Sequence, residues 1–282
     1  MSPLHPFTLF DFAQDKPSPV LPTAPAKVLT IAGSDSGGAA GMQADLKTWA
    51  ALGVYGMSVV TAVTAQNSVA VTAVHPLPAD FVAAQLDAVL SDYGADAVKT
   101  GFIGRVDLIQ TIAASLRQYQ IGNIVIDPVL VNHKGQGMFP PEITQAYIGH
   151  LLPLASLITP NRREAELLTG LSVNSVAEME TAVTRLHTLG AQNVLLKGGR
   201  DGDEVIDLFY DGRSLTRLRS PHINTPNTHG SGDTLSAAVC AFLAQGVGME
   251  TAVRQARQFT YKAIQRAAHW QLGHGHGPVA PG

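Results

Sequence analysis

The fold is decided by the pattern in residues 28–63, which read VLTIAGSDSGGAAGMQADLKTWAALGVYGMSVVTAV. Val28–Ala32 is a short apolar run that ends at a glycine, which is typical of a buried strand. Residues 41–52 then carry apolar side chains at helical spacing, and the β-branched residues in 57–63 predict a second strand. A strand, a helix and a second strand in this order predict two parallel strands joined by a crossover helix.

The same alternation continues to the end of the chain. A helix at 78–90 begins with a proline and is expected to place Phe81, Leu86 and Leu90 along one side. The further predicted elements are strands at 97–99, 124–126, 156–159 and 194–196, a hairpin at 205–218, and helices at 106–119, 176–186, 232–245 and 249–268. This order predicts one α/β domain over residues 27–282, with a mainly parallel central sheet and helices on both faces.

The first 26 residues differ from the rest because they contain six prolines. A segment with so many prolines cannot pair as a strand or continue as a helix, so residues 1–26 are expected to form an extended arm or a disordered leader. The apolar side chains between Phe7 and Phe12 could dock on a partner subunit, and a loose tail is the alternative.

Composition excludes several classes of protein. The net charge is −3, which favours neither a nucleic-acid-binding nor a membrane-binding surface. The sequence has no run of about 18 apolar residues and no apolar signal core near its start, so we expect a cytoplasmic protein. The single cysteine, Cys240, lies in an apolar run, which favours a buried small side chain over a nucleophile.

Polar or glycine-rich sequence follows each of six predicted strands. In open α/β sheets, ligands bind outside the carboxyl ends of the strands, where such segments meet. The six segments are Gly33-Ser34-Asp35, Thr64-Ala65-Gln66-Asn67, Lys99-Thr100-Gly101, Asp127-Pro128, Thr159-Pro160-Asn161 and Lys197-Gly198-Gly199. Together they predict a ligand site along one edge of the sheet.

The strongest motif is Asn227-Thr228-His229-Gly230-Ser231-Gly232-Asp233-Thr234, which directly precedes an apolar helix. Glycines allow a tight turn whose N–H groups converge, and the helix N-terminus adds positive potential. The segment Gly230–Gly232 therefore predicts an anion hole for a phosphoryl group. Asp233 at the helix start is either a functional carboxylate or only a helix cap.

Two other groupings could involve a metal. Asn161 and Glu164 share one face of a predicted helix start, where they could steer Mg²⁺ through water or simply cap the helix. The tail segment 273–277 contains His274 and His276, but histidines flanked by glycines in a tail are more often solvated or packed in a loop.

Taken together, the motifs resemble those of the hydroxymethylpyrimidine/phosphomethylpyrimidine kinases of thiamine biosynthesis, in register over about residues 27–278. The matching segments are 32–38, 41–48, 64–67, 126–129, 159–161, 195–199, 227–232 and 272–278. The resemblance implies a ribokinase-like fold, ATP and Mg²⁺ as cosubstrates, and a homodimer. It also implies phosphorylation of 4-amino-5-hydroxymethyl-2-methylpyrimidine and then of its monophosphate.

The resemblance also implies roles for individual residues. Those implied to contact the pyrimidine are Gly33, Asp45 and Gln66. Those implied to serve the nucleotide and Mg²⁺ are Asp127, Asn161, Glu164 and Lys197, with Asp127 and Glu164 steering the metal through water. Those implied to form the anion hole are Gly230, Ser231 and Gly232.

Two positions depart from this family, which usually has cysteine at the place of Asp233 and methionine at the place of Phe102. Aspartate at position 233 resembles sugar and pyridoxal kinases of the superfamily, where it is the catalytic base, so we expect Asp233 to take the proton of the substrate hydroxyl. Phe102 resembles pyridoxal kinases and is expected to contact the substrate.

These departures leave two alternatives. A pyridoxal or pyridoxine kinase on the same scaffold is favoured by Asp233 and Phe102, whereas Gln66-Asn67 and the tail motif argue against it. A pyrimidine-binding sensor without catalysis is the other alternative, and an intact Asp233 argues against it because a sensor needs no base.

Overall fold

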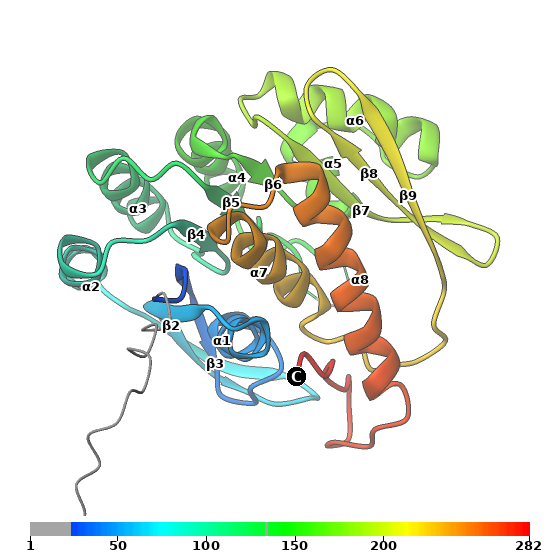
Figure 1. The fold of residues 1–282 in the computed structure, drawn as a ribbon, viewed down its shortest axis with the longest axis horizontal. Helices are drawn as coiled ribbons and strands as arrows, with labels where there is room; N and C mark the ends of the chain where they lie inside the picture. The colour runs from blue at the N-terminus through cyan, green and yellow to red at the C-terminus, as the bar shows by residue number, and fades with distance from the viewer. Residues whose placement is uncertain (1–23, 133–134) are drawn as a thin grey trace, which may run out of the picture.

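The computed structural model describes residues 24–132 and 135–282, so nearly all of the predicted arm at 1–26 lies outside the described residues. Within them, nine strands form one sheet in the order β3-β2-β1-β4-β5-β6-β7-β8-β9 (Figure 1). The strands are β1 (Lys27–Asp35), β2 (Tyr55–Gln66), β3 (Val71–Pro76), β4 (Ala97–Thr100), β5 (Ile124–Ile126), β6 (Leu157–Ile158), β7 (Val194–Asp201), β8 (Glu204–Tyr210) and β9 (Leu215–Pro221).

The six central strands, from β2 to β7, are parallel, and the edge strands β3, β8 and β9 are antiparallel. The expected mainly parallel sheet is therefore confirmed, and β3 is an addition that the sequence pattern did not predict. Strand β2 lies on one side of β1, whereas β4 and the strands after it lie on the other. Such a reversal opens a crevice between the carboxyl ends of β1 and β4, where open α/β sheets bind ligands.

Helices cover both faces of the sheet, as expected. The helices α1 (Gly41–Leu52), α7 (Ser231–Ala244) and α8 (Met249–Ala267) pack on one face (Figure 1). On the other face lie α2 (Ala79–Asp92), α3 (Val106–Gln118), α4 (Pro141–Ala146), α5 (Arg162–Thr169) and α6 (Val176–Thr188). A π-helical turn at Tyr147–Leu151 and a 3₁₀ turn at Leu152–Leu154 follow α4.

Side chains alternate across strand β1 as strand geometry requires. In β1, Val28 joins the core under α1 and α7, whereas Leu29 joins the core on the opposite face. The next residue, Thr30, is buried on the α1 side and is paired in register with Lys99 of β4. A hydroxyl and a charged side chain therefore lie next to each other under α1, at the switch point of the sheet.

One burial prediction was wrong. Phe81 is 56% exposed, and Val82 takes its place in the core with Leu86 and Leu90. The reason is helical geometry, because residues spaced by four share a face more closely than residues spaced by five. No helix among the described residues is both long and apolar enough to cross a membrane.

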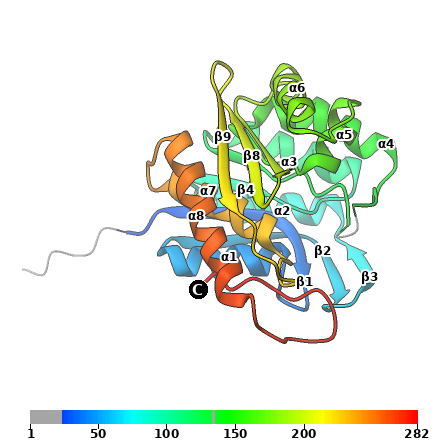
Figure 2. The same cartoon turned by 90° about the vertical axis from the view of Figure 1, so that its right-hand side faces the viewer.

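The C-terminal tail leaves α8, passes the turn between β2 and β3, and returns beside α1 (Figure 2). Ser68, in that turn, accepts hydrogen bonds from the backbone N–H groups of His274, Gly275 and His276. His229 and Val279 continue the connection, since His229 donates to the Gly277 carbonyl and accepts from the Val279 N–H. The tail thus ties the β2–β3 turn to the loop that precedes α7.

We expect Gly275→Ala to weaken this connection. A Cβ on Gly275 would lie 2.1 Å from the carbonyl oxygen of Ser68, so the backbone has to shift. Overpacking of this kind costs about 1–3 kcal/mol of unfolding free energy. Urea unfolding monitored by circular dichroism measures the change. Gly149→Ala is the matched control because a Cβ there meets nothing within 4 Å. Equal stability of the two variants would contradict the tight docking of the tail.

Candidate active site

The glycine-rich loop before α7 has the backbone conformation that its sequence predicted. Gly230 is the residue before the first turn of α7 and has a φ of 78°, which favours glycine. A Cβ on Gly230 would lie 1.8 Å from the carbonyl oxygen of Ala39, so this loop is packed against the loop between β1 and α1. The helix that follows directs its positive end toward the same place.

The loop between β1 and α1 is held by Asp35. One carboxylate oxygen of Asp35 accepts from the N–H of Gly37, and the other accepts from those of Ala39 and Ala40. Asp35 thereby fixes the shape of a loop that touches the anion-hole segment. The structure places this glycine-rich loop between the carboxyl end of β1 and Gly230.

Asp233 lies in the first turn of α7, and its Oδ1 is 3.2 Å from the Nζ of Lys99. Lys99 Nζ also donates to Asp45 Oδ1 at 2.6 Å, and the other oxygen of Asp45 accepts from Thr30 at 2.6 Å. Burial alone would lower the pKa of Lys99, but the carboxylates of Asp45 and Asp233 raise it above its usual value. Lys99 is therefore a buried ammonium ion directly behind the predicted base.

A second lysine, which is partly buried, lies behind the anion hole. Lys197 Nζ is 3.3 Å from Asp127 Oδ1, and Thr159 donates to the same oxygen. The hydroxyl of Ser236, on α7, donates to Asp127 Oδ2. A Cβ on Gly232 would be 3.4 Å from Lys197 Nζ. The structure thus brings the predicted nucleotide residues Asp127 and Lys197 against the backbone of the anion-hole segment.

Asn161 and Glu164 form a reciprocal capping box at the start of α5. The side chain of Asn161 accepts from the Glu164 N–H, and one oxygen of Glu164 accepts from the Asn161 N–H. The other oxygen accepts from the Leu130 N–H. Burial raises the pKa of Glu164 to about 7, although Lys197 opposes the rise. The structure thus confirms that Asn161 and Glu164 cap the helix, and their role with Mg²⁺ stays a prediction.

The predicted substrate residues lie on both sides of the switch point. Phe102 covers Gly33, since a Cβ on Gly33 would lie 3.2 Å from the ring of Phe102. The side-chain nitrogen of Gln66 is 3.2 Å from Nε2 of His229, a residue of the loop before α7. Asp45 is fully buried beneath this group, and its carboxylate is directed to Thr30 and Lys99. The assignment of Asp45 to the pyrimidine therefore stays a prediction.

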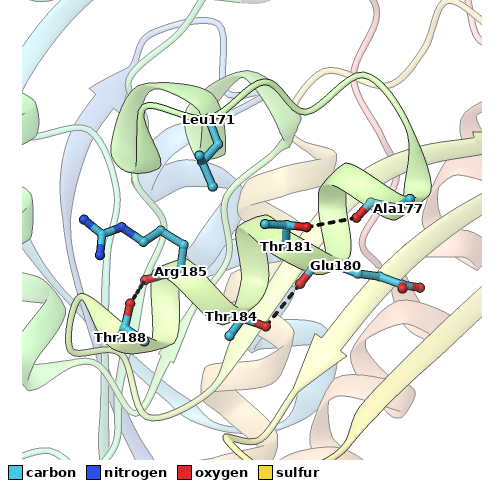
Figure 3. A pocket seen from close by; sticks show the side chains of 7 residues that line it. All are labelled: Leu171, Ala177, Glu180, Thr181, Thr184, Arg185 and Thr188. Atoms are coloured by element: carbon cyan, nitrogen blue, oxygen red, sulfur yellow. Dashed lines mark hydrogen bonds between the residues drawn. The ribbon is translucent and has the colours of Figure 1, made fainter.

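Two hollows formed by the described residues are candidate binding sites. The larger, of about 580 Å³, is an open groove on the outer side of α6, where Thr181, Thr184 and Thr188 donate to carbonyls of their own helix (Figure 3). It contains none of the predicted site residues. The smaller, of about 190 Å³, lies beside the anion-hole segment, and its lining includes Thr228 and Leu235. The smaller hollow is therefore the one that lies next to the Gly230–Gly232 segment.

Comparison with known proteins decides the family. The family model described as phosphomethylpyrimidine kinase matches residues 35–280. The chain belongs to this family. A hydroxymethylpyrimidine/phosphomethylpyrimidine kinase of Rhizobium meliloti is 48% identical over 256 residues, which is 90% of this chain and 96% of the relative.

Solved structures agree with the family and confirm the expected ribokinase-like α/β fold. The ADP complex of Bacillus subtilis pyridoxal kinase superposes with a TM-score of 0.85 at 40% identity, covering 91% of this chain and 97% of that structure. A phosphomethylpyrimidine kinase of Clostridium difficile gives a TM-score of 0.77 at 38% identity, covering 85% and 99%. The kinase family and its pyridoxal kinase neighbours thus share one scaffold.

Three residues of this kinase site were given no role by sequence reasoning. Lys99 was noted only as part of a polar strand end, although a lysine inside a short strand of a parallel sheet is itself a signal of a buried charge pair. Asp35, after a strand and before two glycines, is typical of a carboxylate that holds a loop. His229 lies within the strongest motif, but its contact with Gln66 spans 163 positions of sequence and needed the structure.

The tail histidines do not form a metal centre with their neighbours. His276 accepts from or donates to the Thr228 hydroxyl at 2.8 Å, and its ring lies 5.2 Å from that of His229. Among the described residues, no group of three or more His, Cys, Asp and Glu side chains is arranged to hold a metal ion. Cys240 is fully buried, which confirms its expected place in the core, and burial raises the pKa of its thiol.

Proposed function

We propose that this chain transfers the γ-phosphoryl group of ATP to the hydroxymethyl group of 4-amino-5-hydroxymethyl-2-methylpyrimidine and then to the resulting monophosphate. The chain is a phosphotransferase of the hydroxymethylpyrimidine/phosphomethylpyrimidine kinase type, in thiamine biosynthesis. The observation that carries the residue assignments is the convergence of Asp233, Lys197 and the backbone of Gly230–Gly232 at the carboxyl end of the sheet.

The nucleotide is proposed to lie between the smaller hollow and the anion-hole segment. The lining of this hollow offers apolar surface from Ile223, Leu235 and Ile264 to a nucleobase, and Thr228 joins it to the glycine-rich loop. Lys197 then faces the phosphates, where its charge offsets theirs. The ADP bound by the Bacillus subtilis pyridoxal kinase supports a nucleotide on this scaffold.

The residues present fit Mg²⁺ only as an ion that keeps most of its water. Carboxylate oxygens are the ligands that Mg²⁺ prefers, and Asp127 and Glu164 supply them on neighbouring elements. Their oxygens already accept hydrogen bonds from Lys197, Ser236 and backbone N–H groups, which suits water-mediated rather than direct contact. When bound, Mg²⁺ would offset the negative charge of the nucleotide phosphates.

Asp233 is proposed to take the proton of the acceptor hydroxyl while the Gly230–Gly232 N–H groups stabilise charge on the transferring phosphoryl group. Its side chain is 16% exposed, whereas Asp45 and Lys99 behind it are fully buried, so Asp233 is the member of the group that can reach a substrate. Release of ADP that depends on the pyrimidine, measured in a coupled assay, tests the activity. Absence of such release at millimolar acceptor would overturn it.

Gln66 is expected to recognise the aminopyrimidine edge, because an amide offers both a donor and an acceptor. Gln66→Ala leaves polar groups of the bound ligand unpaired, at about 1–3 kcal/mol. The dissociation constant of the pyrimidine should rise roughly 5- to 150-fold by that energy, while ATP affinity stays nearly constant. Titration calorimetry with each ligand measures both. An unchanged pyrimidine affinity would remove Gln66 from the site.

Phosphorylation of pyridoxal or pyridoxine is the second candidate function. It is favoured by Phe102, which covers Gly33 and packs against Phe139 with ring centroids 5.5 Å apart and ring planes tilted by 50°, and by the similarity to pyridoxal kinase structures. An aromatic wall suits any flat heteroaromatic ring.

The homodimer implied by the resemblance and the cytoplasmic location stay predictions. Light scattering on the purified full chain tests the homodimer by its mass.

A further inference from the structure

A group of buried polar side chains lies behind Asp233, and the role inferred for it below rests on the proposed phosphoryl transfer. Thr30 and Lys99 are neighbours in register on β1 and β4, the two strands that border the switch point. Both are fully buried, and both donate to Asp45 of α1. Lys99 alone reaches further and donates to Asp233 of α7. One lysine therefore joins two carboxylates from two different helices.

The two carboxylates differ in what they can do. Asp45 is fully buried, and both of its oxygens accept hydrogen bonds, from Thr30 and from Lys99. Asp233 is 16% exposed, and the contact with Lys99 is made by Oδ1, which leaves Oδ2 for another partner. Because Asp45 already supplies a counterion at 2.6 Å, folding alone does not require a second carboxylate on Lys99.

The arrangement suits a carboxylate that has to gain and lose a proton. In the transfer step, the substrate hydroxyl oxygen forms a bond to the γ-phosphorus, the bond from that phosphorus to ADP breaks, and the hydroxyl proton passes to Asp233. Once Asp233 is neutral, Lys99 still has Asp45 as its counterion. No buried charge is left unpaired at any stage, which avoids the large cost of an isolated ion in the interior.

We propose that Asp45 and Lys99 act as a positioning pair for Asp233: Lys99 holds its carboxylate toward the acceptor, and Asp45 keeps Lys99 in place and charge-balanced when Asp233 is protonated. Neither Asp45 nor Lys99 needs to touch the substrate in this role. The role assigned to Asp45 therefore differs from a pyrimidine contact, and the two assignments predict different kinetics.

The test is a cycle of four proteins in which no member leaves a fully buried charge unpaired. They are the wild type, Asp233→Asn, the paired variant Asp45→Asn/Lys99→Met, and the combination of all three changes. The readouts are kcat and KM for the alcohol acceptor and for its monophosphate, with thermal melting of each protein. The cycle uses whichever alcohol the wild type phosphorylates, pyridoxine included, so loss of the pyrimidine activity alone overturns the proposed substrate and not this inference.

The kcat of the paired variant for the alcohol should be roughly 10- to 100-fold lower than that of the wild type. A positioned base contributes about 10²–10⁴-fold, and loss of its positioning should remove a part of that factor. The KM of the paired variant should stay within about twofold, because a residue that acts only in the transition state changes kcat and not ground-state binding. In the Asp233→Asn background, the same two changes should cause no further loss. The monophosphate acceptor should be affected little in either background.

Two results would overturn the inference. An equal loss in the wild-type and Asp233→Asn backgrounds would show that the pair supports the fold or the pocket independently of Asp233. A rise in KM for both acceptors with unchanged kcat would instead return Asp45 to the pyrimidine contacts. If the paired variant melts below the assay temperature, Asp45→Asn alone replaces it, because this variant leaves Lys99 paired with Asp233. Its kcat and KM for both acceptors then distinguish a positioning role from a pyrimidine contact.

Discussion

Replacing Asp233 with asparagine is expected to slow phosphorylation of the hydroxymethyl group by about 10²–10⁴-fold, which is the usual contribution of a positioned base. The shape of the side chain is kept, and Lys99 retains Asp45 as its counterion, so the protein should fold normally. The relevant measurement is kcat/KM for hydroxymethylpyrimidine at fixed ATP and Mg²⁺, with thermal melting as the control for folding.

The same variant should slow phosphorylation of the monophosphate far less. A phosphate monoester has a second pKa of about 6, so it is already largely ionised at neutral pH and needs no base. A carboxylate near such a dianion also repels it. The ratio of the two kcat/KM values should therefore shift toward the monophosphate in Asp233→Asn. Equal losses on both acceptors would mean that Asp233 positions the phosphoryl group or the metal and does not act as a base.

Gly232→Ala is expected to lower turnover by about 10²–10³-fold or more while the protein stays folded, since loss of one anion-hole donor alone has that effect. The added Cβ would lie 3.4 Å from Lys197 Nζ and 4.0 Å from the carboxylate of Asp127, which is close contact without a clash. It would therefore fit the protein but take up space between the loop and Lys197, where the phosphoryl group is proposed to lie.

Gly230→Ala is the informative contrast. A Cβ there would lie 1.8 Å from the carbonyl oxygen of Ala39, and the residue has a positive φ. This variant should lose stability as well as activity, seen as a lower melting temperature. If Gly232→Ala retained most of its activity at an unchanged melting temperature, the assignment of this loop to the phosphoryl group would be wrong.

Much of the fold could be predicted because its pattern is local. The helix at 41–52 begins and ends where its spacing indicated, and the helix expected at 176–186 is present as α6, Val176–Thr188. Strand β3 was missed because it is exposed along most of its length and shows no apolar face. Helix α4 and the π-helical turn after it were also missed, since elements of about one turn leave no periodic signal in a sequence.

The candidate site was only partly predictable, for a physical reason. Polar residues that directly follow predicted strands gather at one edge of the sheet. Gln66, Asp127 and Lys197 were predicted to lie in the site because they occupy such positions. Sequence spacing does not say which of them meet below the surface. The contact between Lys99 and Asp233 crosses 134 positions, and Asp45 reaches Lys99 from a helix that packs over the sheet. Such pairs follow from packing and not from any local pattern.

The central claim is that this site phosphorylates a pyrimidine alcohol, and wild-type kcat/KM values measured side by side test it most directly. The acceptors are hydroxymethylpyrimidine, its monophosphate, pyridoxine and pyridoxal, each with ATP and Mg²⁺. We predict the highest value for the pyrimidine alcohol or its monophosphate, with formation of the phosphorylated pyrimidine confirmed by mass spectrometry. Higher values for pyridoxine or pyridoxal, with little pyrimidine product, would contradict the account and assign the site to the second candidate function.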